Sequence, residues 1–528
     1  MSGSFDKRSD GAARRQARIQ KEQKEKRKIR IITVSVVIVL ALLFIGALFL
    51  NSKVTRRNIT AVTVGGVSFT PVEFDYFLNT AYQEYKNMVN EQMGSYASSM
   101  LPSTTSPLTS QIFDEDTGQT WADYIYDYAI IQMSELVQYF NEAKAAGYVL
   151  PDDERETMNS QITDFKQYIE LFQSFDAYIQ GIYGSNINES SFRRLNEFIT
   201  TATSYSKFKH DSFTYSTDEK VNYYHENRDT LDVFTYRYFI IYAETVTQAD
   251  YDTDEAYDAA KEAALADASE KAALIAAEIV TEEDFINAAR DLNESQYIDA
   301  DSTLHSYPGS WLGSYYGPWL RESERAYGDV TTADMTSGTY VVFFNDRDNN
   351  NYNMTEMRQI LMLREKIDPE DYEEGEEDPA YLEAIADADV DAAQRAEAAY
   401  EKFLSDGATE AALMSMMEEY SDDSTEGGFY SDISKNPNQN KMVKEIEDWL
   451  FEDGRQYGDY AMIQTEDYGY HLVFFMGFGE NCSEFLADDE MRDNDYSAWK
   501  ESLPAVEATK HWAFILTSQD ISAYNKQQ

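Results

Sequence analysis

A run of twenty apolar residues near the N-terminus constrains this chain more than any other feature of its sequence. Residues Ile31 to Leu50 contain no charged side chain, and a helix of about 20 apolar residues spans the hydrocarbon core of a bilayer. Eleven Lys and Arg residues precede the run, whereas Lys53, Arg56 and Arg57 follow it. Because basic flanks stay in the cytoplasm, the sequence predicts a single-pass cell-membrane protein, with residues 1–30 cytoplasmic and the bulk extracytoplasmic.

A cleaved signal peptide is the rival interpretation of this run. The apolar part of a signal peptide is usually shorter and ends at a small-x-small cleavage site, and no clear site of that kind follows Leu50. No cysteine stands just after the run, which excludes a lipoprotein anchor. We therefore prefer an uncleaved signal anchor over residues 31–50, and cleavage stays the alternative.

Charge is distributed unevenly along the chain. Residues 1–57 carry 14 Lys and Arg against 4 Asp and Glu, a net +10, so the remainder of a chain with a net charge of −51 carries −61. An acidic body of this kind repels nucleic acid. We expect the membrane as a partner and no nucleic acid, and the sequence does not indicate the oligomeric state.

Metal and cofactor sites are not indicated either. The single cysteine, Cys482, permits no internal disulfide, and the five histidines show no spacing typical of a metal site. The acidic residues at 387, 389 and 391 resemble the start of a calcium loop, but Ala392 and Ala398 stand where that loop needs glycine and glutamate. We expect no cofactor.

Residues 58–230 have the pattern of a helical domain. A short strand with a glycine turn is predicted at Val62–Phe69, and Thr70, Pro71 and Glu73 then have the order of a helix start: cap, proline, acid. Residues 98–120, rich in Ser, Thr and Pro, predict a loop. The predicted helices cover residues 73–93, 121–146, a segment starting at 151, 190–208 and 217–227.

Two later segments share a series of landmarks and predict an internal repeat. The landmarks of residues 232–346 are Trp319-Leu320, Gly328-Asp329 and GTYVVFF from Gly338. Those of residues 354–480 are Trp449-Leu450, Gly458-Asp459 and GYHLVFF from Gly469, at nearly the same spacings. Alternating apolar residues predict strands at 233–242, 358–361 and 467–476, and helices are predicted at 256–277, 282–292 and up to residue 450. The expected fold is therefore multidomain α+β.

The segments between and after these repeats are predicted to be simpler. The stretch NDRDNNN at residues 345–351 is expected to be a polar linker, and the acidic residues 367–391 are expected to form a solvated loop. Residues 481–528 have helical periodicity around Trp499 and are expected to form a helical tail that packs back on the helical domain.

The order of elements in residues 354–480 resembles the parvulin (PpiC-type) peptidyl-prolyl isomerases. A strand at Arg358–Leu361 and a helix ending in Tyr420–Asp423 are followed by Gly427-Gly428, then Met442 with a helix, then the GYH strand. Four pieces of the helical domain, VGGVSFTPVEF, EAKAAGYVLPDDE, YGSNINESSFRR and STDEKVNYYHENRD, resemble the chaperone domain of SurA- and PrsA-like foldases. The resemblance implies a small antiparallel sheet flanked by helices in each repeat.

The activity that this resemblance implies needs no covalent step. The amide C–N bond has partial double-bond character and a rotation barrier of about 18–20 kcal/mol. A catalyst must bind the twisted amide better than the planar one, which requires an apolar slot for the proline ring and a dry polar floor beside the rotating bond.

The family's site residues can be carried over one by one. His471 matches the histidine of the closing strand, Asp423 the Cys/Asp position, and Met442 the methionine wall. Gln359 stands where the family has a first histidine, and Ile446 where it has a phenylalanine. We therefore expect His471, Asp423 and Gln359 as catalytic residues and Met442, Ile446 and Tyr430 as substrate-binding residues.

The first repeat departs further from the family. Tyr238 and Tyr340 replace the two histidines, which indicates a degenerate domain. Its aromatic side chains form either a cradle for extended apolar peptide or an ordinary hydrophobic core. Three functions remain open at this point. One is an isomerase that assists the folding of secreted, extended polypeptides, one a non-catalytic holdase, and one an envelope scaffold on the same fold.

Overall fold

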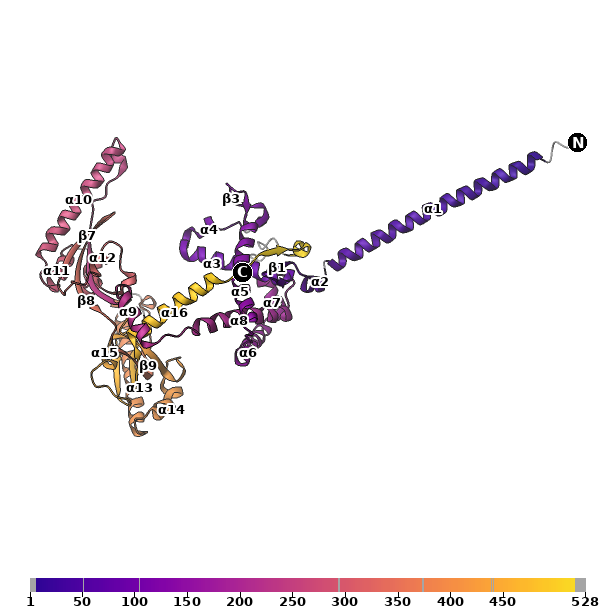
Figure 1. Ribbon diagram of the computed structural model, residues 1–528. Helices are drawn as coiled ribbons and strands as arrows, with labels where there is room; N and C mark the ends of the chain where they lie inside the picture. The colour runs from indigo at the N-terminus through magenta and orange to yellow at the C-terminus, as the bar shows by residue number, and fades with distance from the viewer. Residues whose placement is uncertain are drawn as a thin grey trace. The chain divides into compact units, whose positions relative to one another are not determined.

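The computed structural model describes residues 6–50, 52–103, 105–292, 295–372, 375–437, 439 and 441–517. These residues form two compact units, the first from the described residues within 6–213 and 495–517, the second from those within 214–494. The fold is mixed α+β, with small antiparallel sheets and many helices (Figure 1).

The apolar run lies in a long helix, α1 (Asp6–Leu50), drawn in indigo in Figure 1. Its part Lys26–Gly46 is long and apolar enough to span a membrane, and it is the one such helix in the described part of the chain. The helix already begins at Asp6 and so includes most of the basic segment before the apolar run. A short helix, α2 (Lys53–Asn58), follows, capped by the Ser52 hydroxyl.

The first unit is a helical domain with a small sheet. The predicted strand with a glycine turn is a hairpin of β1 (Val62–Val64) and β2 (Val67–Phe69), and the predicted cap is present, because Thr70 and Glu73 form a capping box. On helix α5, buried side chains recur at residues 125, 129, 133 and 137. This is the spacing of one helical face. The helices are α3 (Pro71–Met93), α4 (Ala97–Met100), α5 (Trp121–Ala145), α6 (Asp152–Glu170), α7 (Phe175–Tyr183) and α8 (Glu189–Asp211).

Two details of this unit differ from the predictions. Part of the loop expected at residues 98–120 forms a two-stranded ribbon, β3 (Ile112–Asp114) with β4 (Gln119–Thr120). In the described part of the tail, α16 (Cys482–Ser502) is followed by β13 (Ala508–Lys510), which pairs with β1, and by a short 3₁₀ helix at Trp512–Leu516. The C-terminal segment thus packs on the helical domain, as expected, but through a strand, because Ala508–Lys510 extends the hairpin by one edge.

The second unit contains two four-stranded antiparallel sheets with the same strand order. The first sheet runs β6-β5-β8-β7 and the second β10-β9-β12-β11. The elements of the first repeat are β5 (Val233–Tyr242), α10 (Asp254–Glu278), α11 (Glu282–Asp291), β6 (Leu304–Pro308), α12 (Gly317–Leu320), β7 (Val330–Met335) and β8 (Gly338–Asp348). Those of the second are β9 (Asn353–Leu363), α13 (Pro379–Ser405), α14 (Glu410–Tyr420), β10 (Phe429–Ile433), α15 (Lys444–Leu450), β11 (Tyr460–Thr465) and β12 (Gly469–Asn481).

Strand register agrees with the predicted repeat. Tyr340 lies opposite Ile240 on the neighbouring strand, and His471 lies opposite Leu361. Each of these two residues is the third of its strand and therefore occupies the same sheet position. The strands GTYVVFF and GYHLVFF are equivalent elements of two related sheets.

Side-chain contacts repeat as well. The Arg237 guanidinium lies 2.6 Å from Glu282, and Tyr327 donates to the same carboxylate. In the second repeat Arg358 lies 2.8 Å from Glu410, which also accepts from a tyrosine, Tyr457. Because these contacts involve equivalent elements, their recurrence supports the repeat independently of strand order.

Three expectations about segment boundaries were wrong. Residues 379–391 are not loop but the first half of α13, because alanines at alternate positions favour a helix despite the acidic side chains. The expected linker is partly strand, and Asn350 is 1% exposed, donating to the Tyr224 hydroxyl and the Leu231 carbonyl. These bonds place α9 (Thr217–Leu231) in the second unit, whereas the sequence grouped it with the helical domain.

Candidate functional site

The predicted site residues lie on the face of the second sheet that packs against α15. On β12, Leu472 and Phe474 belong to the core under α13 and α14, whereas Val473 and Phe475 belong to the core under α15. His471 shares the parity of Val473 and Phe475, as the alternation predicted. β9 and β12 are antiparallel neighbours, so side chains of both strands meet on this face.

A chain of hydrogen bonds joins the three predicted catalytic residues. His471 Nδ1 lies 2.9 Å from Gln359 Oε1, and Gln359 Nε2 donates to Asp423 Oδ2 at 2.7 Å. The Tyr430 hydroxyl donates to the same carboxylate oxygen at 2.8 Å. At the other end, the Thr465 hydroxyl lies 3.0 Å from His471 Nε2.

The direction of these bonds assigns the protons. Asp423 is an acceptor, so the Gln359 amide group must donate to it, which leaves Gln359 Oε1 as the acceptor facing His471. His471 therefore carries its proton on Nδ1, and its Nε2 accepts from Thr465. Every polar atom of the imidazole ring is satisfied, as expected for a buried polar group.

Burial sets the ionisation of the site. Desolvation lowers the pKa of His471 to about 4, although the carboxylates of Asp423 and Glu445 oppose the shift. Burial raises the pKa of Asp423, but the Thr425 N–H and the Gln359 and Tyr430 side chains outweigh it, and the net pKa is lowered. At neutral pH the site thus combines a neutral imidazole with a carboxylate anion.

Exposure separates the residues that can touch a ligand from those beneath them. His471 and Gln359 are each 4% exposed, whereas Asp423 and Tyr430 are half-buried. His471 was expected to be a catalytic residue, but its ring is covered. Asp423 and Tyr430 are therefore the accessible end of the hydrogen-bonded chain.

Two glycines position the loop that carries Asp423. Gly427 and Gly428 have φ angles of +59° and +55°, which non-glycine residues rarely adopt. A Cβ at position 428 would lie 2.2 Å from the Gln359 carbonyl oxygen, so the loop approaches β9 more closely than any other residue would permit. The glycine pair thus permits the tight loop that brings Asp423 within hydrogen-bonding distance of Gln359.

The predicted apolar wall is only partly accessible. Ile446 is fully buried in a core cluster with Met357 and Val473. Met442 and Tyr430 are partly buried and pack against the same cluster. Met442 is thus partly accessible, whereas Ile446 is covered.

Sequence reasoning missed Thr465 and Thr425. Thr465 contacts His471, and Thr425 contacts both Asp423 and Tyr430, with its hydroxyl 2.9 Å from that of Tyr430. Threonines outside any motif carry no sequence signal. Among the described residues, no group of three or more His, Cys, Asp or Glu side chains is arranged to hold a metal ion.

The first repeat has an aromatic cluster at the equivalent position. Tyr238 stacks on His305 with ring centroids 4.3 Å apart, and the Tyr340 ring lies 5.4 Å from that of Tyr238. His305 lies opposite Tyr236 on β5, as Tyr430 lies opposite Met357 on β9. Aromatic stacking thus replaces the polar chain, and the role of His305 was not evident from the sequence.

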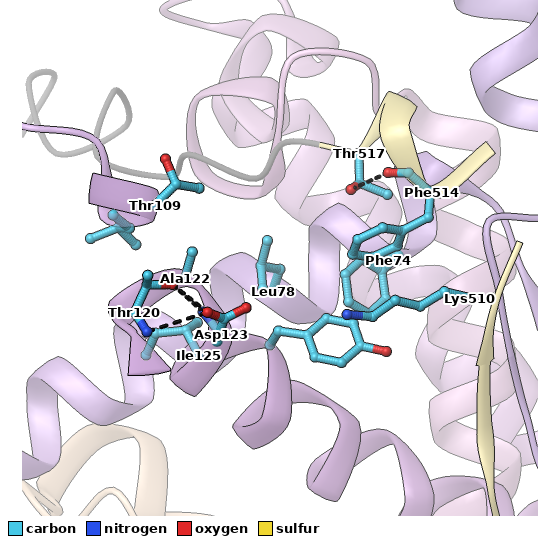
Figure 2. A pocket seen from close by; sticks show the side chains of 12 residues that line it. Phe74, Leu78, Thr109, Thr120, Ala122, Asp123, Ile125, Lys510, Phe514 and Thr517 are labelled. Carbon is cyan, nitrogen blue, oxygen red and sulfur yellow. Dashed lines mark hydrogen bonds between the residues drawn. The ribbon is translucent and has the colours of Figure 1, made fainter. Parts of the chain in front are cut away.

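The first unit contains a separate cavity of about 230 Å³. Figure 2 shows Phe74, Leu78 and Ile125 on its wall, with Lys510 and Phe514 supplied by the C-terminal segment. The Lys510 ammonium lies 3.5 Å from the centroid of the Tyr126 ring, within cation–π range. Apolar and polar side chains line this cavity in similar measure, since Thr120, Asp123 and Lys510 also face it, and it lies in a different unit from His471.

Comparisons with known proteins add little to this geometry. No family model matches the chain, and no curated protein matches it. Among solved structures, the crystal structure of PrsA from Bacillus subtilis is similar to 51% of this chain and 87% of that chain, with 9% identity and a TM-score of 0.14. A similarity at this level carries no argument for function.

Proposed function

We propose that the chain is a membrane-anchored, extracytoplasmic folding factor whose second repeat, residues 354–480, is a parvulin-type peptidyl-prolyl isomerase acting on secreted polypeptides. The observation that carries this proposal is the hydrogen-bonded chain from His471 through Gln359 to the accessible Asp423. The resemblance of the same residues to the parvulin motif supports it.

In this proposal the substrate amide lies beside Asp423, with its proline ring against Met442. Asp423 and Tyr430 supply the polar groups next to the rotating bond, and the covered His471 and Gln359 position them through hydrogen bonds. A site that is held rigid and excludes water can favour the twisted amide over the planar one. Asp423 is thus the proposed catalytic residue, with His471 and Gln359 as positioning residues.

Gln359 is the main departure from the parvulin pattern. Its hydrogen bonds still connect His471 to Asp423. Its carboxamide accepts from His471 at one end and donates to Asp423 at the other. A histidine could bridge the same two partners. We expect isomerase activity to be weak, since only one of the two family histidines is present.

Restoring that histidine tests the proposal. In an isomerisation assay with a short prolyl peptide, Gln359→His in the full chain is expected to raise kcat/KM several-fold, because the imidazole completes the site of the family. Equal far-UV circular dichroism would show that the variant folds. If neither the native chain nor Gln359→His accelerates isomerisation, the enzyme proposal fails.

A non-catalytic holdase is the alternative, and the cavity of the first unit favours it. The apolar part of its wall, with Phe74, Leu78 and Ile125, suits an apolar client side chain, and Asp123 and Lys510 beside it supply polar contacts. Assays on the native chain and on Gln359→His distinguish the holdase from the isomerase. Protection of an aggregating client without any isomerisation would support the holdase.

The proposed topology predicts the outcome of limited proteolysis. Protease added to intact cells or spheroplasts is expected to digest the bulk of the chain and to spare the first thirty residues, since the basic flank lies in the cytoplasm. Lysed cells are the control, in which the first thirty residues should also be digested. Protection of the whole chain in spheroplasts would contradict the proposed orientation.

A further inference from the structure

The C-terminal turn carries two exposed apolar side chains. This turn, Trp512–Leu516, is a 3₁₀ helix, in which residues three apart lie above one another. Trp512 and Ile515 are 55% and 71% exposed, whereas Ala513 and Leu516 are buried in the first unit. One side of the turn is therefore packed, and the other presents a tryptophan and an isoleucine to the surroundings.

Hydrogen bonds tie this turn to the segment that leaves the apolar helix. Arg56 donates from Nη1 to the Leu516 carbonyl at 2.6 Å, and the His511 N–H donates to the Ala61 carbonyl at 2.8 Å. The Thr55 hydroxyl in turn donates to the Phe49 carbonyl, in the last turn of α1, at 2.6 Å.

Distance along the chain limits how far the turn can lie from a membrane. Arg56 is six residues beyond Leu50, and six residues span at most about 20 Å. If α1 crosses the bilayer, Trp512 and Ile515 are held near the surface from which it emerges. Val54, between these points, is also 67% exposed.

The charges around the turn complement an anionic surface. Lys53 is exposed, and Arg56 and Arg57 are half-buried. The Lys510 ammonium lies over the Tyr126 ring of the first unit, and the chain beyond residue 57 is strongly acidic. Basic side chains next to a membrane helix attract anionic headgroups, and tryptophan favours the bilayer interface. The apolar and the basic groups thus fit the same partner.

We propose that the Trp512–Ile515 turn inserts into the headgroup region of the bilayer that α1 enters, with the neighbouring basic side chains against anionic lipids. The proposal rests on α1 spanning the membrane. The turn then acts as a second contact, so that the first unit is fixed to the surface rather than tethered by α1 alone.

A fluorescent label at position 515 tests this contact. The full-length Ile515→Cys chain is labelled with an environment-sensitive dye and reconstituted in vesicles of equal parts phosphatidylcholine and phosphatidylglycerol. Cys482 is fully buried, so it needs no replacement. The reference is the same labelled chain unfolded in denaturant without detergent. In vesicles we expect the emission of the label to shift to the blue, and its quenching by aqueous iodide to be several-fold lower.

The matched control is Leu171→Cys, a 75% exposed apolar position of the same unit. Its label should stay accessible to iodide. A chain that floats with the vesicles but leaves position 515 as accessible as position 171 would overturn the proposal while keeping the anchor, and protection of both positions would overturn a selective contact. A chain that does not float would overturn both the anchor and this proposal.

Lipid composition tests the electrostatic part. Protection at position 515 is expected to weaken in vesicles of phosphatidylcholine alone, and to weaken in Lys53→Glu when phosphatidylglycerol is present. Equal protection in all cases would refute the role of the basic side chains. Protection of the label by an extended apolar peptide, and not by vesicles, would assign the turn to a polypeptide client instead.

Discussion

Replacing Gly428 by alanine is expected to destabilise the second repeat by about 3 kcal/mol or more. The new Cβ would lie 2.2 Å from the Gln359 carbonyl oxygen and 2.9 Å from the terminal methyl of Met417. Met417 can move, but the Gln359 carbonyl belongs to the central strand pair and cannot. The loop must therefore withdraw and carry Asp423 away from Gln359.

Hydrogen–deuterium exchange measures this effect locally. Gly428→Ala is expected to speed exchange in β9 and β10, and to abolish any isomerase activity. The matched control is Gly454→Ala, because Gly454 also has a positive φ, +87°, but no atom lies within 4 Å of its added Cβ. Gly454→Ala should lower the free energy of unfolding only by the cost of an alanine in the left-handed backbone region, about 1 kcal/mol. Equal exchange in the two variants would contradict the close approach.

The second large effect is a loss of stability at acid pH that originates from His471. Its pKa is about 4 in the folded chain against 6.5 for an ordinary histidine, because burial disfavours the imidazolium. Between pH 6.5 and 4 the unfolded chain binds the proton and the folded chain does not, so stability falls as pH falls. The contribution of His471 to the free energy of unfolding is fully present above pH 6.5. It decreases by about 3 kcal/mol as the pH falls to 4, at 1.36 kcal/mol per pH unit.

His471→Asn isolates this contribution. The asparagine amide can stand in place of Nδ1–H and donate to Gln359, but it does not titrate. We expect its unfolding free energy, from urea titrations, to depend less on pH between 6.5 and 4 than that of the native chain. Taking the difference at each pH cancels other groups, including His305, whose pKa burial also lowers. An unchanged pH dependence would show that His471 is not buried as a neutral group.

Because His471 is buried, truncating its side chain to alanine would lower stability as well as activity. If His471 contacted the substrate, His471→Ala would lower activity far more than stability. A side chain that is 4% exposed and bonded to both Gln359 and Thr465 cannot be truncated without leaving unpaired polar groups. Asp423, which is half-buried, is the better position for separating activity from stability.

The strands and most helices could be predicted because their patterns are local. β5 has the bounds read from alternating residues at Val233–Tyr242, and α3 begins after the predicted Thr70 cap. The acidic part of α13 was predicted to be a loop because its acidic side chains favour solvent. The helix propensity of its alanines determines the structure instead. The strand pairing of β13 with β1 depends on residues more than 400 positions apart, and no local pattern indicates it.

The candidate site was predictable in its membership but not in its depth. Alternation along the closing strand assigns His471 to a face, yet it does not show what covers that face. Ile446, expected to line a slot, is fully buried, and Thr465, which the sequence did not single out, bonds to the imidazole. Depth and partners depend on tertiary packing, which one sequence does not encode in any short motif.

The internal repeat offers the most direct test of the central claim, because a substitution in the first repeat serves as the control for one in the second. Cis–trans exchange of a prolyl peptide can be measured by magnetisation-transfer NMR with the full chain, Asp423→Ala and Tyr340→Ala. Tyr340 occupies in the first repeat the position of His471 in the second. We predict catalysed exchange with the native chain and with Tyr340→Ala, and a loss of at least about tenfold in Asp423→Ala, as expected when a group acting on the transition state is removed. Exchange that Asp423→Ala leaves unchanged would contradict the assignment of isomerase activity to the second repeat.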